Sequence, residues 1–219
     1  MFLGHFAMGM AAKKIAPESS LGMLFFAAQF MDLLWPVLLL LGVEHVRLDP
    51  GNTAVTPLDF YDYPWTHSLA GALLWALLLS AGYYVIQRSK RNAVVVGILV
   101  FSHWLLDFLS HRPDLPLAPG SSTMFGLGLW NSFRATALLE LALGFSGAWV
   151  YLRSTDPVDR IGKFGSWGLI GVLFAIYMLN LFGPPPPDVR SIVIAGNALW
   201  LIVAWAHWCD GHREGDSLH

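Results

Sequence analysis

Long apolar stretches separated by short polar turns run through this sequence. Six of them are long enough for an α-helix to cross a bilayer, which takes about 20 apolar residues. They are residues 21–43, 67–87, 92–111, 132–153, 164–183 and 189–208. Residues 2–15 are apolar but too short to cross, which predicts a half-span or an interfacial helix. We therefore expect an all-α integral membrane bundle of about six transmembrane helices plus a short N-terminal half-helix.

Basic residues gather in alternate turns of this pattern. They are Lys13 and Lys14, the RSKR turn at 88–91, and Arg153, Arg160 and Lys163. Because basic turns stay in the cytoplasm, we expect these turns and the C-terminus inside. The longer loops 44–66 and 112–131 are then outside. The expected location is the inner (plasma) membrane of a prokaryote, crossed several times.

The composition supports a membrane protein. Charged residues make up 13% of the chain, against about 25% in soluble domains. The net charge of −2 argues against a nucleic-acid partner, since no basic face of useful size is available. The single cysteine, Cys209, excludes an intrachain disulfide and a cysteine-rich metal site. No repeat or shift in composition divides the chain, so residues 1–219 are expected to form one transmembrane helical domain.

Ionisable residues inside apolar stretches cost a few kcal/mol each and are therefore candidates for function. They are His5, Asp32, His67, His103, Asp107, His111 and Glu140. At about 1.5 Å of rise per residue, His103, Asp32 and Glu140 lie roughly 18–20 Å from the cytoplasmic end. His5 and Asp107 can share this layer, with His67 and His111 above it, so the constellation is expected to open outward.

Three of these residues recur every four positions in the stretch 92–111. Each step of four advances about 40° beyond a full helical turn, so His103, Asp107 and His111 point into one quadrant. Imidazole and carboxylate together favour a transition metal, most often zinc, with iron or manganese as alternatives. A metal would cancel the carboxylate charge and give each imidazole a partner, which offsets the cost of desolvation.

Each candidate also has a purely structural interpretation. The stripe at 103–111 suits helix capping or an interhelical hydrogen-bond set, and Asp32 suits an ion pair with Arg134. Glu140 suits a bond to Arg134 or to a helix amide. His5 suits the membrane interface, and so does His67, with Thr66 as a helix N-cap.

Four motifs follow one another over residues 4–111, about half of the chain. They are GHF at 4–6, FMDLLWP at 30–36, PWTHSL at 64–69 and FSHWLLDFLSH at 101–111. In order and rough spacing they resemble the YdjM-like family of predicted membrane-bound metal-dependent hydrolases. The Thr-His-Ser and Ser-His-x-x-x-Asp elements are the most specific. The resemblance implies a set of metal ligands, namely His5, Asp32, His67, His103 and Asp107.

The chain departs from the family pattern in two motifs. Leu34 stands where the family has a second acidic residue, and residues 62–64 read Asp-Tyr-Pro where the family has His-Arg-Gly. Asp62, His111 or Glu140 would compensate for these losses. The family is similar to zinc phospholipase C and related nucleases, a distant analogy that implies phosphoester hydrolysis.

The leading hypothesis is a hydrolase in which one or two metals activate a water toward a lipid or lipid-linked phosphoester. Asp62 or Glu140 is the expected general base, and Arg112 and Arg134 are expected to hold the phosphate. One alternative is a transporter that moves protons or metal ions through the same cluster. A second is a structural membrane subunit whose metal only holds the bundle together.

Overall fold

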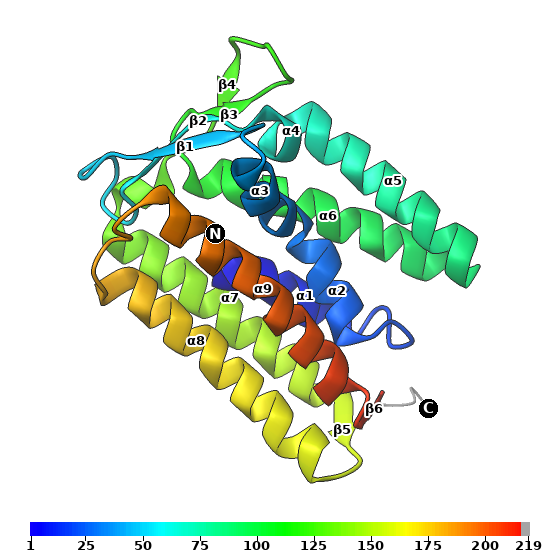
Figure 1. The fold of residues 1–219 in the computed structure, drawn as a ribbon. Coiled ribbons are helices and arrows are strands. Elements are labelled where there is room, and N and C mark those ends of the chain that lie inside the picture. The colour runs from blue at the N-terminus through cyan, green and yellow to red at the C-terminus, as the bar shows by residue number, and fades with distance from the viewer. Residues whose placement is uncertain (216–219) are drawn as a thin grey trace.

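A computed structural model describes residues 1–215 as a helical bundle with three short two-stranded antiparallel sheets (Figure 1). Its α-helices are α1 (Leu3–Ala12), α2 (Leu21–Ala28), α3 (Phe30–Leu40), α4 (Pro64–His67), α5 (Leu69–Gln87), α6 (Lys90–Ser110), α7 (Phe133–Arg153), α8 (Ser166–Phe182) and α9 (Val189–Asp210). Two hairpins pair β1 (His45–Leu48) with β2 (Leu58–Asp62) and β3 (Leu115–Pro116) with β4 (Met124–Phe125). The third sheet pairs β5 (Thr155–Pro157) with β6 (Arg213–Gly215) from the end of the described chain. A 3₁₀ turn (Leu129–Asn131) precedes α7, and a π-helical turn (Ile161–Gly165) leads into α8.

Five helices in the described residues are long and apolar enough to cross a membrane. They are α5, α6, α7, the continuous helix Ile161–Phe182 that includes α8, and α9. The pair α2 and α3 passes the same test only when taken together, and its two parts meet at a bend of 59°. The all-α class is therefore confirmed. The stretch 21–43, expected as one transmembrane helix, consists of two helices that meet at this bend.

The bend between α2 and α3 falls at Gln29. Its backbone (φ −102°, ψ 6°) departs from helical geometry, and a local break of this kind is a usual cause of a sharp kink. The break takes the Ala28 carbonyl out of the regular helical hydrogen-bond pattern. That carbonyl instead accepts a hydrogen bond of 2.8 Å from His103 Nδ1. The bend thus ties the broken segment to α6.

Helix α1 lies inside the bundle, so the interfacial alternative for residues 2–15 is wrong. Eight of its ten residues are buried, and it packs against α7, α2 and α6. A helix that is apolar on all sides favours such burial. Small residues allow the close approach, since a Cβ built on Gly147 of α7 would lie 2.6 Å from Ala7 Cα.

Two hydrophobic cores lie on either side of the molecule's centre. One joins α2, α3, α5 and α6 through residues such as Met31, Val96 and Leu99, and the other joins α1, α7, α8 and α9 through residues such as Phe6 and Leu173. The hairpins β1–β2 and β3–β4 close one end of the bundle, whereas the α5–α6 and α7–α8 turns lie at the other (Figure 1). The basic turns and the long loops therefore sit at opposite ends.

The substitution Gly147→Ala should destabilise the protein, because its new Cβ would lie 2.6–2.8 Å from atoms of Ala7. Overpacking of this kind typically costs about 1–3 kcal/mol. Gly171→Ala in α8 is the matched control, since no atom lies within 4 Å of its Cβ. Thermal unfolding in detergent measures the difference. Equal melting temperatures for the two variants would contradict the close packing of α1 on α7.

Candidate metal centre

Two carboxylates and four imidazoles converge where α1, α3, α4 and α6 meet. They are His5 from α1, Asp32 from α3, His67 from α4, His103 and Asp107 from α6, and His111 directly after α6. All of them except Asp32 are buried. The structure therefore brings together the six residues that the sequence suggested as metal ligands.

The spacing of their inward atoms suits ligands of a common ion. His103 Nε2 lies 3.2 Å from Asp107 Oδ2 and 3.6 Å from Asp32 Oδ1. His67 Nε2 lies 3.5 Å from Asp32 Oδ1 and 3.7 Å from Asp107 Oδ2. His5 Nε2 lies 3.1 Å from Asp107 Oδ1. Neighbouring ligands on a tetrahedral zinc ion, with bonds of about 2.0–2.1 Å, are about 3.3–3.4 Å apart.

Hydrogen bonds on the outer side decide which nitrogen of His103 faces inward. Its Nδ1 lies 2.8 Å from the Ala28 carbonyl, which can only accept, so Nδ1 carries the proton. In the neutral ring, Nε2 then presents a lone pair to the two carboxylates. A metal-binding histidine usually has such an outer acceptor on its other nitrogen.

Acceptors thus face acceptors in this cluster. His103 Nε2 is buried and has no hydrogen-bond donor among the described residues. A nitrogen lone pair and carboxylate oxygens at these distances repel one another unless a proton or a metal ion lies between them. Imidazole nitrogen and carboxylate oxygen are the donors that zinc, iron and manganese accept. The residues present therefore fit a metal ion.

Two overlapping groups can hold an ion. One consists of His5, His103 and Asp107, the other of Asp32, His67 and His103, and within each group the ligand atoms lie within 4.8 Å of one another. The Met1 amino nitrogen lies 2.6 Å from Asp107 Oδ1 and 2.9 Å from His5 Nε2.

His111 joins the cluster from its edge. It follows the last residue of α6 with an extended backbone (φ −67°, ψ 148°), so it does not continue the helical stripe that we expected. Its Nε2 lies 3.9 Å from Asp107 Oδ1, and its Nδ1 lies 3.0 Å from Asp114 Oδ1. Tyr63 donates to the same Asp114 oxygen at 3.0 Å. Burial and the Asp114 carboxylate raise the pKa of Tyr63 well above its usual value, so this hydroxyl remains a donor.

Aromatic side chains cover the cluster on the side of the hairpins. The rings of Trp130 and Phe60 lie 4.2 and 5.0 Å from that of His111, and the ring of Tyr63 lies 4.9 Å from that of His67. The exposed edge of the cluster is Asp32, with 31% of its side chain exposed, against 2% for Asp107. Aromatic side chains thus cover the hairpin side of the cluster, and Asp32 is its exposed member. That the site opens outward stays a prediction.

Glu140 is not among the converging groups. Its Oε1 accepts the backbone N–H of Phe2 and its Oε2 that of Gly4, each at 2.9 Å. A carboxylate in this position satisfies free N–H groups at the start of α1 and complements the helix dipole. This is the helix-amide interpretation considered from the sequence, and it fixes the helix that carries His5.

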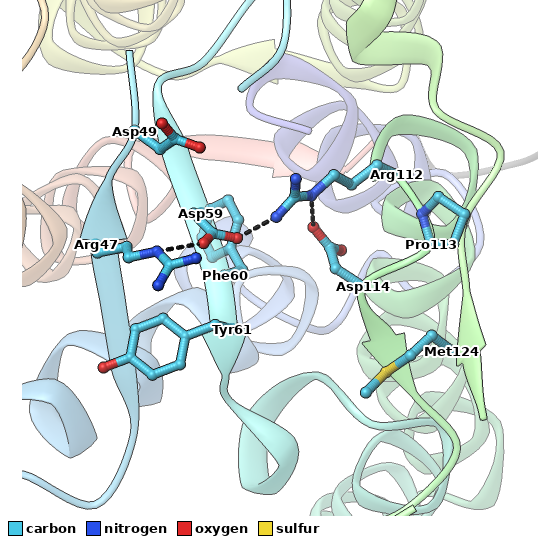
Figure 2. A pocket seen from close by; sticks show the side chains of 9 residues that line it. All are labelled: Arg47, Asp49, Asp59, Phe60, Tyr61, Arg112, Pro113, Asp114 and Met124. Carbon is cyan, nitrogen blue, oxygen red and sulfur yellow. Dashed lines mark hydrogen bonds and ion pairs between the residues drawn. The ribbon is translucent and has the colours of Figure 1, made fainter. Parts of the chain in front are cut away.

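The other three suggested residues also lie apart from the ligands. Asp62 Oδ2 lies 2.8 Å from His45 Nδ1 on the β1–β2 hairpin. Arg112 pairs with Asp59 and, at 3.3 Å, with Asp114, in an open cleft of about 260 Å³ (Figure 2). Two carboxylates thus already neutralise this guanidinium. Arg134 is exposed in the first turn of α7.

Sequence reasoning missed the residues that support the ligands from outside. Asp114 binds His111, and its place three residues further along the chain was a usable signal. Glu44 accepts hydrogen bonds from Thr66, which adjoins His67. No spacing links Glu44 to Thr66, since 22 residues and a hairpin separate them.

No protein-family model, curated protein or solved structure matches this chain. The resemblance to the YdjM-like family therefore rests on the four motifs alone.

The protein, purified in mild detergent without a polyhistidine tag, should contain near-stoichiometric zinc, iron or manganese by elemental mass spectrometry. His103→Ala should lose the metal, because His103 belongs to both ligand groups. His212→Ala is the matched control, since His212 pairs with Asp159 between the α7–α8 turn and the end of the chain. Absence of metal from the unmodified protein, even after loading, would contradict a metal centre.

Glu140→Gln should lower the melting temperature, because the amide cannot accept both N–H groups at the start of α1. A lost hydrogen bond to a charged group typically costs about 1.5–3 kcal/mol. A general base would behave differently, with turnover lost and the melting temperature unchanged. Thermal unfolding and turnover measured on the same preparation separate the two roles.

Proposed function

We propose that this chain is an integral-membrane, metal-dependent phosphoester hydrolase, similar in kind to the YdjM-like family. The observation that carries the proposal is the convergence of the five residues that the resemblance singles out. They are His5, Asp32, His67, His103 and Asp107. Four separate helices supply them, and their inward imidazole nitrogens and carboxylate oxygens are ligand types that a transition-metal ion accepts.

Zinc is the ion that we expect, with iron or manganese as alternatives, because the ligands are imidazoles and carboxylates. When bound, such an ion lowers the pKa of a coordinated water toward neutrality and polarises a phosphoryl oxygen. The chain itself holds the imidazoles in place through Ala28, Thr66 and Asp114. Its aromatic cover excludes bulk water from the hairpin side.

Asp32 is the group that we expect an incoming substrate to meet first. It is the exposed member of the cluster, whereas Asp62 and Glu140 are engaged elsewhere. A carboxylate at this edge can accept the proton of an attacking water. Arg134 stays a predicted phosphate-binding residue, and it lies exposed in the first turn of α7, apart from the cluster.

A lipid or lipid-linked phosphoester is the substrate class that suits a site embedded in a membrane bundle. Five long apolar helices and one broken pair support a membrane location. The exposed residues Trp149, Trp167 and Trp208 lie near the basic turns, where an aromatic belt is expected. We propose the inner membrane, with the basic turns in the cytoplasm and the metal centre toward the outer face.

The test is hydrolysis of a chromogenic phosphodiester and of a phospholipid by the purified protein. Activity should stop on chelation and return when zinc is added back. Asp107→Asn should lower turnover by more than about 100-fold, beyond the usual effect of an outer-sphere substitution. Asp159→Asn is the matched control, because Asp159 is exposed and pairs with His212.

Two other results would favour a different function. Metal-dependent ion movement in proteoliposomes without turnover would assign the cluster to transport. Loss of melting temperature on chelation, with neither turnover nor transport, would assign it to a structural role.

A further inference from the structure

Glu44 is a buried carboxylate that the proposed chemistry does not use. It lies between α3 and β1, with 1% of its surface exposed. Its Oε1 accepts the backbone N–H groups of Trp65 at 2.7 Å and Thr66 at 2.8 Å. Its Oε2 lies 2.7 Å from the Thr66 hydroxyl oxygen. Both oxygens of Glu44 are therefore committed to the start of α4.

The direction of these hydrogen bonds follows from the chemistry of each group. A carboxylate only accepts, so the Thr66 hydroxyl donates its proton to Glu44. The same hydroxyl oxygen lies 2.7 Å from His67 Nδ1, and with its own proton already used it can only accept there. His67 Nδ1 must therefore carry the ring proton. The Nε2 lone pair of the neutral ring then faces Asp32 and Asp107.

We propose that Glu44 and Thr66 are positioning residues that fix His67 in its metal-binding tautomer. This role depends on the metal centre proposed above, because the two residues would keep His67 able to bind the ion through Nε2. An imidazole with its proton on Nε2 would direct N–H at the ion and could not bind it. Outer partners of this kind typically change metal affinity by about 10–100-fold when they are removed.

A simple helix cap would use only part of this arrangement. The two N–H groups bound by Glu44 Oε1 are enough to cap the four-residue helix α4. The hydroxyl link from Oε2 to His67 is additional, and it can be removed without touching the cap. Thr66→Val removes the hydroxyl at nearly constant volume, whereas Thr66→Ser keeps it.

Glu44→Gln tests the direction of the chain of hydrogen bonds. Because Oε1 accepts two N–H groups, the amide oxygen must stay there, and the NH₂ group must face the Thr66 hydroxyl. The hydroxyl would then accept from the amide and donate to His67 Nδ1. The ring proton of His67 would then move to Nε2, where it would prevent this nitrogen from binding the ion. A change of one atom would thus reverse the tautomer.

The experiment measures the zinc dissociation constant of the full-length protein in detergent by competition with a chelating dye, together with the melting temperature. Thr66→Val and Glu44→Gln should bind zinc about 10–100-fold more weakly, and Thr66→Ser should bind close to the level of the unmodified protein. Thr136→Val is the matched control, because Thr136 is buried and bonds only to the Leu129 carbonyl. Its zinc affinity should not change.

Zinc binding by Thr66→Val at the unmodified affinity would overturn the positioning role, as would an equal loss in Thr136→Val. If Thr66→Val does not fold, Glu44→Gln decides the same question, since it preserves volume and the cap. If the unmodified protein binds zinc but does not hydrolyse phosphoesters, only the proposed hydrolase function is overturned. The zinc affinities of the variants still test the positioning role of Glu44 and Thr66. Unmodified protein that binds no zinc would overturn both.

Discussion

The carboxylate of Asp107 is buried at the centre of the cluster and has to be compensated by groups from several helices. Only 2% of its side chain is exposed, inside an apolar bundle, and an uncompensated charge there costs several kcal/mol. Imidazoles from three helices and the Met1 amino group surround it. The helices that carry these groups must meet at one place, and this requirement organises the middle of the bundle.

The irregular parts of the fold cluster at the same place. Helix α1 is too short to span a membrane, and Glu140 secures its first turn. The break at Gln29 leaves the Ala28 carbonyl to His103, and α6 ends just before His111. Within a membrane, non-helical backbone is tolerated where protein surrounds it. The bundle therefore departs from regular helices where the ligands need particular directions.

Function, as we propose it, depends on the asymmetry of this cluster. Its ligands are held from outside by a carbonyl, a hydroxyl and a carboxylate, and aromatic rings cover its hairpin side. Asp32 alone among the ligands is substantially exposed. A rigid, mostly dry ligand set with one accessible carboxylate suits an ion that must be retained while a substrate approaches.

The helices and the chemical character of the cluster follow from the order of the amino acids. Hydropathy and helical periodicity are local properties, so five of the six stretches and the pairing of His103 with Asp107 could be predicted. The burial of α1, the capping of its start by Glu140 and the contact of Glu44 with Thr66 emerge from the folded chain. These contacts join residues far apart in the chain, and their geometry depends on how loops and a helix break fold back. Hydropathy and residue spacing along the sequence do not specify which distant residues meet.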